Sequence, residues 1–171
     1  MPVFDVSHFD SKYRVPLKGG LYSIHSSGEQ GNEIILNGQG VNKTIRFNEA
    51  NIAWFDRDKR FALIVERYGD RIFWLDSVEA RLVCCAFMIN RTENDFECYM
   101  EAFEHNDGPI VLYEFGVISF DPTGRVLWNL KSKDRLIGQP AIVNGEILRI
   151  VVHEQIFRID LQHGQFMNTA P

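Results

Sequence analysis

The chain has 171 residues, of which 45% are hydrophobic and 24% are charged, a composition that fits one globular domain and excludes a disordered protein. Its net charge of −5 argues against a nucleic-acid partner, because phosphate neutralisation requires clustered Lys and Arg. No apolar run approaches the roughly 20 residues that span a bilayer, and residues 1–10 lack a signal-peptide pattern. We therefore expect a cytoplasmic protein without a membrane partner.

Taken in chain order, short segments rich in β-branched and aromatic residues alternate with turn residues, which predicts strands. An irregular segment covers about residues 1–19, and a short helical turn is expected at residues 48–51. Strands are expected at residues 20–25, 33–36, 44–47, 61–66, 71–76, 81–89, 95–105, 116–120, 125–130, 141–143, 146–152, 156–160 and 165–167. The sequence thus predicts a single, predominantly antiparallel all-β domain over residues 1–171.

Two turns are predicted from their residue types. Asn144 and Gly145 separate two apolar segments and both tolerate positive φ, which is typical of the type I′ turn of a hairpin. Residues 121–124 read Asp-Pro-Thr-Gly, which favours a type I turn with proline at its second position. Repeated hairpins are therefore the expected building units.

The three cysteines are Cys84, Cys85 and Cys98, and an odd number with two adjacent residues argues against a disulfide framework. Because side chains alternate along a strand, Cys84 and Cys85 should lie on opposite faces, one of them buried. A core role is expected for the buried thiol rather than a reactive one, since no Lys or Arg is adjacent.

An internal repeat has the form strand, Asp, short turn, strand. Its aspartates are Asp76, Asp121 and Asp160, which are 45 and 39 residues apart. In two of the units a glycine precedes the return strand, at Gly124 and Gly164. Repeated supersecondary units of this size pack side by side.

Residues 120–128, Phe-Asp-Pro-Thr-Gly-Arg-Val-Leu-Trp, resemble the repeat of quinoprotein-type β-propellers. In that family an aspartate-containing turn and a glycine precede a tryptophan strand in each four-stranded blade. The resemblance implies propeller-like architecture, although a β-sandwich meander of hairpins would give the same pattern. It implies no cofactor, since nothing in the sequence matches a quinone or metal site.

A block of acidic residues stands out between residues 92 and 124, which hold eight carboxylates and no Lys or Arg. The candidate partner-binding residues are Glu93, Asp95, Glu97, Glu101, Glu104 and Asp107. Clustered carboxylates steer association with a cationic partner, so the leading hypothesis is a non-catalytic domain that binds a basic protein, of the immunity or inhibitor type. Calcium binding and ion pairs with Lys and Arg elsewhere in the fold are alternatives.

The second hypothesis is a hydrolase or lyase whose carboxylates and histidines meet at one end of the sheets. Its candidate residues are Glu114, Asp121, His153 and Glu154. No phosphate loop, zinc helix or serine elbow is present, so such a site would be assembled from distant residues. An enzyme predicts a concave pocket, whereas an interaction domain predicts a broad acidic face. The sequence makes no prediction of the oligomeric state.

Overall fold

The structure is a computed structural model. It describes strands within residues 4–46 and, with gaps at residues 59, 67–68, 77–78, 80 and 90–99, residues 50–167. Within this part of the chain the regular secondary structure consists of β-strands, and no helix occurs. The prediction of an antiparallel all-β fold is confirmed.

The strands form four antiparallel sheets that follow one another along the chain. Sheet 1 contains β2 (Arg14–Pro16), β3 (Ser23–Ser27), β4 (Glu33–Gly38) and β5 (Val41–Arg46). Sheet 2 contains β6 (Ala50–Phe55), β7 (Phe61–Glu66), β8 (Arg71–Asp76) and β9 (Arg81–Phe87). Sheet 3 contains β10 (Met100–His105), β11 (Gly108–Tyr113), β12 (Gly116–Phe120) and β13 (Val126–Lys131), with β1 (Phe4–Asp5) added beside β10. Sheet 4 contains β14 (Gln139–Val143), β15 (Ile147–Val152), β16 (Gln155–Asp160) and β17 (Gln165–Phe166).

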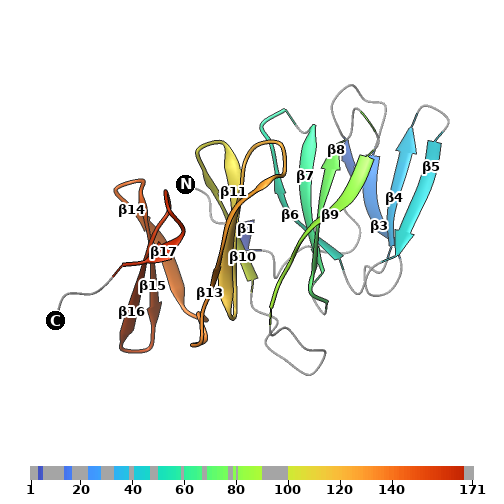
Figure 1. Ribbon diagram of the computed structural model, residues 1–171. Coiled ribbons are helices and arrows are strands. Elements are labelled where there is room, and N and C mark those ends of the chain that lie inside the picture. The colour runs from blue at the N-terminus through green and yellow to red at the C-terminus, as the bar shows by residue number, and fades with distance from the viewer. Residues whose placement is uncertain are drawn as a thin grey trace.

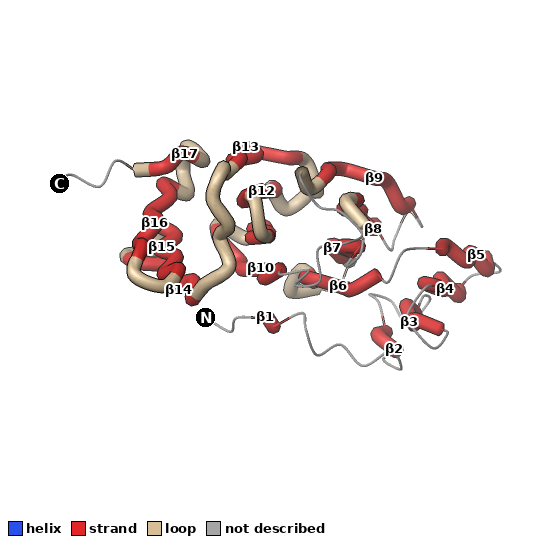
Figure 2. Tube along the Cα trace, turned by 90° about the horizontal axis from the view of Figure 1, so that it is seen from below, coloured by secondary structure: helices blue, strands red, loops and turns tan. Residues whose placement is uncertain are grey.

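The sheets lie side by side in chain order (Figure 1). Seen along the strands, they fan out as an arc, with β6, β10 and β14 toward the inner side and β9, β13 and β17 toward the outer side (Figure 2). Each sheet therefore runs from the inside outward in sequence order, as the blades of a propeller do.

Sheet 3 lies between two hydrophobic cores, and β11 contributes to both. Val111 and Tyr113 pack with residues of sheet 2, including Trp74. Ile110 and Leu112 pack with residues of sheet 4. Because neighbouring side chains of a strand point to opposite faces, a strand between two sheets is apolar at every position. All six residues of β11 are buried.

The repeated aspartates occupy equivalent places in sheets 2, 3 and 4. Asp76, Asp121 and Asp160 each follow or end the third strand of their sheet. Each carboxylate accepts hydrogen bonds from backbone N–H groups of its own turn, such as Gln162 N at 2.8 Å from Asp160 Oδ1. The repeat read from the sequence is therefore a structural turn motif.

Two of the expected turns and one expected helix are tested directly. Asn144 and Gly145 have φ of 53° and 73°, as a type I′ turn requires, and Gly124 N donates to Asp121 O at 3.0 Å in the other turn. The helical turn at residues 48–51 is wrong, because β6 begins at Ala50 and pairs with β7. The pairing partner across the sheet overrides the weak local preference for a helix.

Other differences concern strands. Of the strand expected at residues 95–105, the part from Met100 is confirmed and the part before it lies outside the described residues. β11 was not predicted, and the segment at residues 1–19 contributes β1 and β2. β1 pairs with β10, with Phe4 opposite Ala102.

Candidate functional site

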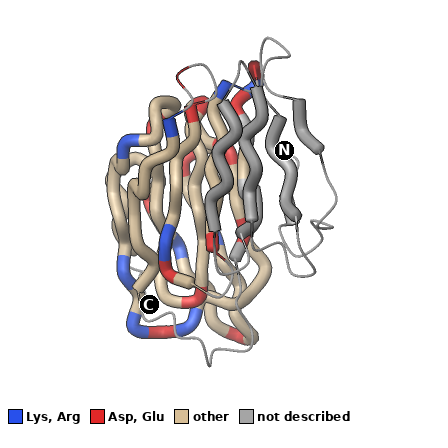
Figure 3. Tube along the Cα trace, turned by 90° about the vertical axis from the view of Figure 1, so that its right-hand side faces the viewer, with Lys and Arg blue, Asp and Glu red and all other residues tan. Residues whose placement is uncertain are grey.

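The residues of the acidic block do not share one face. Glu93, Asp95 and Glu97 lie outside the described residues. Glu101 and Glu104 are both on β10 but three positions apart, so their side chains leave opposite faces of sheet 3. Figure 3 shows acidic and basic positions interspersed along the described strands and turns.

The remaining members of the block differ in their surroundings. Asp107 is exposed in the turn between β10 and β11, with φ of 61°. Glu114 is fully buried in the turn between β11 and β12. The part of the acidic block that the structure describes is therefore divided between two faces, a turn and the interior.

The four candidates for an enzyme site are divided between the two ends of the sheets. Glu114 lies in the turn before β12, and Asp121 follows the last residue of the same strand, so they stand at opposite ends. His153 and Glu154 form the turn between β15 and β16, which is the equivalent turn of sheet 4 and so lies at the Glu114 end. The structure thus places three of the four at one end of the sheets and separates Asp121 from them.

Asp121 has a structural role in its turn. Its Oδ1 accepts hydrogen bonds from Thr123 N at 2.8 Å, Thr123 Oγ1 at 2.7 Å and Arg125 N at 3.0 Å. Desolvation alone would raise the pKa of Asp121, but these hydrogen bonds, together with the charge of Arg125, outweigh it and lower the pKa below 3.8. The carboxylate therefore stabilises the turn between β12 and β13.

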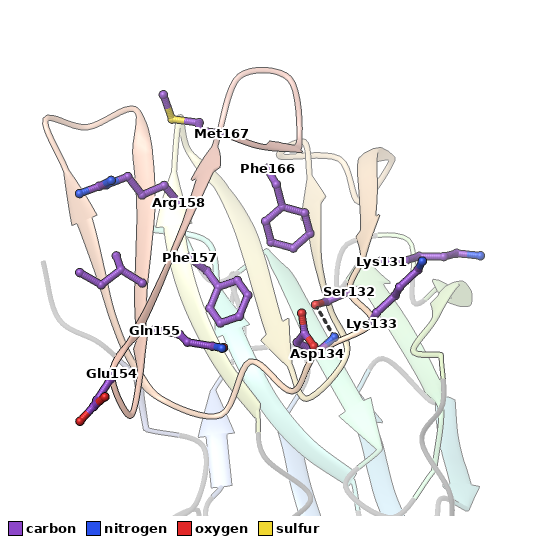
Figure 4. A pocket seen from close by; sticks show the side chains of 11 residues that line it. Lys131, Ser132, Lys133, Asp134, Glu154, Gln155, Phe157, Arg158, Phe166 and Met167 are labelled. Carbon is purple, nitrogen blue, oxygen red and sulfur yellow. Dashed lines mark hydrogen bonds between the residues drawn. The ribbon is translucent and has the colours of Figure 1, made fainter. Parts of the chain in front are cut away.

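A pocket of about 820 Å³ lies at the Glu114 end of the sheets, between the segment that follows β13 and the strands β16 and β17. It is lined by residues 131–134, residues 154–158, Phe166 and Met167. The close view shows Ser132, Asp134, Gln155 and the rings of Phe157 and Phe166 around one space (Figure 4). Glu154 and Arg158 also line the pocket, but their side chains point away from this space (Figure 4).

The segment that carries Ser132 and Asp134 is held by sheet 3. Ser132 N donates to Phe115 O at 2.9 Å, and Leu136 N donates to Glu114 O at 2.7 Å. Leu136 is fully buried in the core between sheets 3 and 4. The connection from β13 to β14 is therefore tied to the β11–β12 turn on both sides of Asp134, which fixes its position at the pocket.

The aromatic wall of the pocket comes from sheet 4. Phe157 stands opposite Ile150 and packs against the core shared with sheet 3. Its ring centroid is 6.2 Å from that of Phe166, with the two planes tilted by 56°. Phe166 is 37% exposed, so part of its ring is available to a bound molecule.

The polar residues of the pocket have complementary chemistry. Ser132 Oγ accepts a hydrogen bond from Asp134 N at 3.2 Å, which orients the hydroxyl beside the carboxylate. Lys131, the last residue of β13, and Lys133 are the chain neighbours of Ser132, and their side chains point away from the space between the rings (Figure 4). A carboxylate can take up a proton, an amide such as Gln155 can hydrogen-bond a carbonyl oxygen, and lysines attract an anion.

Sequence reasoning missed this group because Asp134 and Gln155 come from separate segments and form no motif. Among the described residues, no three His, Cys, Asp or Glu side chains come together in a way that could hold a metal ion. The same residues contain no helix long and apolar enough to cross a membrane.

Comparisons with known proteins identify the fold. No family model and no curated protein matches the sequence. The chain is similar to the solved structure of the dihydro-heme d1 dehydrogenase NirN in complex with DHE, with 13% identity and a TM-score of 0.53, over 93% of this chain and 36% of that one. It is also similar to the periplasmic gluconolactonase PpgL of Pseudomonas aeruginosa, with 13% identity and a TM-score of 0.54, over 94% of this chain and 53% of that one. The chain thus spans about half or less of the length of each.

These likenesses change the functional hypothesis. The prediction of a non-catalytic domain with an acidic binding face is wrong, because both solved structures are of enzymes and the described acidic residues do not form one face. The enzyme alternative, with a site at one end of the sheets, agrees better with the comparisons. The resemblance to propeller repeats is confirmed, and the chain has an all-β fold of the β-propeller type.

Proposed function

We propose that the protein is a hydrolase that opens a small lactone, a cyclic ester, in the pocket beside Asp134. The observation that carries the proposal is the meeting of Asp134, Ser132 and Gln155 with two phenyl rings in one pocket. Pockets that combine apolar walls with a few convergent polar groups are the usual sites of small molecules. The similarity to a gluconolactonase favours a sugar lactone among such substrates.

The reaction uses few groups. The Asp134 carboxylate takes a proton from a water molecule while the water oxygen attacks the carbonyl carbon of the lactone. Gln155 donates a hydrogen bond to the carbonyl oxygen as negative charge develops there. The ring C–O bond then breaks, and the leaving oxygen takes the proton from Asp134. The product is a hydroxy acid, whose carboxylate is attracted by Lys131 and Lys133.

The test is a panel of five- and six-membered sugar lactones, with hydrolysis followed by proton release above the uncatalysed background. We expect turnover of at least one lactone, and we expect Asp134→Asn to lower kcat/KM by about 100-fold or more, as loss of a general base does. Asn is close to Asp in size, so the fold should be retained, and circular dichroism checks this.

Asp107→Asn is the matched control. Asp107 is an exposed carboxylate in the turn between β10 and β11, at the opposite end of the sheets from Asp134, and Asn tolerates its positive φ. This variant should hydrolyse the lactone at the parent rate. If no lactone is turned over, or if Asp134→Asn is as active as the parent, the proposed function is wrong.

A further inference from the structure

Sheet 4 has two different faces. One face packs against sheet 3, where Leu148, Ile150 and Ile159 are fully buried. The other face, which we call the outward face, carries Val151, Ile156 and Met167, because these positions alternate with the buried ones. Ile156 is 40% exposed and Met167 is 41% exposed. The outward face thus presents apolar side chains that are uncovered in the part of the chain that the structure describes.

The outward face matches the covered face of sheet 3 position by position. Val117 precedes Asp121 by four residues and stands opposite Leu112. Ile156 precedes Asp160 by the same four residues and stands opposite Val151. Val117 and Leu112 are completely buried because sheet 4 covers them. The outward face of sheet 4 is therefore equivalent to the face by which sheet 3 packs against sheet 4.

The contact between sheets 3 and 4 also involves the outer strand of sheet 3. Trp128 stands opposite Ser119, and its ring is covered by Gly164 of sheet 4. Met167 N donates to Arg158 O at 2.8 Å, which places Met167 opposite Arg158, the equivalent of Ser119 two residues before the turn aspartate. Met167 is thus where Trp128 would be, and no glycine turn covers it in the part of the chain that the structure describes.

The outward face also carries the charges of two arginines. Arg149 and Arg158 stand directly opposite each other on β15 and β16, and like charges in this arrangement repel. Within the described residues neither guanidinium takes part in an ion pair.

We infer that the outward face of sheet 4 binds sheet 1 of a second copy of this chain. The four sheets form an open arc that has sheet 4 at one end and sheet 1 at the other (Figure 2). Two arcs related by a twofold axis place each sheet 4 against the partner's sheet 1 and close a ring of eight sheets. Propellers contain four to eight sheets, and twofold dimers are the commonest assemblies.

The experiment is the mass of the full chain in solution, measured by light scattering after size-exclusion chromatography at about 100 µM, a concentration at which interfaces of micromolar affinity are formed. The proposal predicts twice the monomer mass of 19.8 kDa. Ile156→Glu places a charge in the middle of the outward face and should give the monomer mass. Leu127→Glu is the matched control, because Leu127 is 59% exposed on β13 and lies outside this face. It should remain dimeric.

Three outcomes would overturn the inference. The parent could elute at the monomer mass, or as a concentration-dependent series beyond the dimer, which would mean that no ring closes. A spin label on Met167→Cys separates the ring from a simpler dimer, since the two labels are far apart across a ring. A contact-range distance between them would show that the two sheet 4 faces bind each other instead. If Ile156→Glu fails to fold, Met167→Glu, at a position that is 41% exposed on the same face, takes its place.

Discussion

Gly164 of sheet 4 packs against the indole ring of Trp128 of sheet 3. The Nε1 atom of Trp128 donates a hydrogen bond to Leu161 O at 3.1 Å. A Cβ atom added to Gly164 would lie 2.3 Å from Cδ2 of that ring. Gly124 has the same relation to Trp74 one sheet earlier, with a distance of 2.2 Å. The glycine before each return strand is therefore a contact between sheets as well as a turn residue.

This contact predicts unequal effects for two glycine substitutions. Gly164→Ala adds both a steric clash with Trp128 and a strained φ of 63°, whereas Gly145→Ala adds only the strain of a φ of 73°, with no atom within 4 Å. Backbone strain alone costs about 1 kcal/mol, and overpacking adds about 1–3 kcal/mol. Urea unfolding should therefore show a clearly larger loss for Gly164→Ala, and equal losses would mean that the ring moves aside freely.

The buried ion pair of sheet 2 gives a second prediction. Arg71 Nε donates to Glu66 Oε2 at 2.8 Å, and the Glu66 side chain is 1% exposed. Arg71→Ala would remove this cation from a buried carboxylate and should lower the free energy of unfolding by about 2 kcal/mol, less than for a fully buried pair because the Arg71 side chain is 41% exposed.

Arg81→Ala is the control for the ion pair. Arg81 Nε lies 3.9 Å from Glu79 Oε2, and both side chains are 59% exposed. Loss of this pair should therefore lower the free energy of unfolding by less than about 1 kcal/mol. If Arg71→Ala is as mild as Arg81→Ala in urea unfolding, the buried pair does not stabilise the fold.

Cys85 should be protected from alkylation in the folded protein. Its ionisation should also lower the free energy of unfolding at alkaline pH. Burial raises the pKa of its thiol to about 12, and Sγ donates to Ile72 O at 3.4 Å. The folded protein then keeps a proton that the unfolded chain releases near its ordinary pKa of 9.0. This contribution to stability is present below pH 9 and is lost as pH rises toward 12.

The two measurements are iodoacetamide labelling at pH 8 and urea unfolding between pH 8 and 11. We expect Cys85 to be labelled only on unfolding, and the midpoint of the parent to fall with pH more steeply than that of Cys85→Ala. Rapid labelling of Cys85 in the native protein would contradict the assignment of this thiol to the core.

Asp121 should matter to stability in acid and not to hydrolysis. Since its pKa is lowered in the folded state, its contribution is present above pH 3.8 and is lost as pH falls through the folded pKa. Asp121→Ala should therefore unfold at lower urea concentration than the parent at pH 7, with the difference shrinking toward pH 3. Its kcat/KM on a lactone should equal the parent value, and a large loss there would return Asp121 to the list of catalytic candidates.

The turn chemistry of this fold could be predicted from the sequence because it depends on local residue types. Asn144 and Gly145 adopt positive φ, and the aspartates at positions 76, 121 and 160 recur at equivalent turns. β11 could not be recognised by alternation, since a strand covered by sheets on both faces is apolar throughout. β6 was missed because its pairing with β7, a tertiary contact, decides its conformation.

The candidate site could not be predicted from local sequence patterns either, because tertiary contacts bring its residues together. Asp134 lies on a connection whose path is set by the backbone hydrogen bonds of Ser132 and Leu136 to another turn. Gln155 and Phe157 reach the same pocket from sheet 4. The acidic block gave a wrong prediction of one binding face because a count of charges along the sequence ignores the alternation of side chains in a strand. That alternation places Glu101 and Glu104 on opposite faces of sheet 3.

The most direct test of the proposed site is to observe where its product binds. With ring-labelled phenylalanine, NMR spectra are recorded as the hydroxy acid of the hydrolysed lactone is added, and the signals are assigned with Phe157→Leu and Phe166→Leu. The account predicts shifts of the Phe157 and Phe166 signals and none for Phe73, which lies in sheet 2. No change at saturating acid, or shifts confined to other rings, would contradict a lactone site in this pocket.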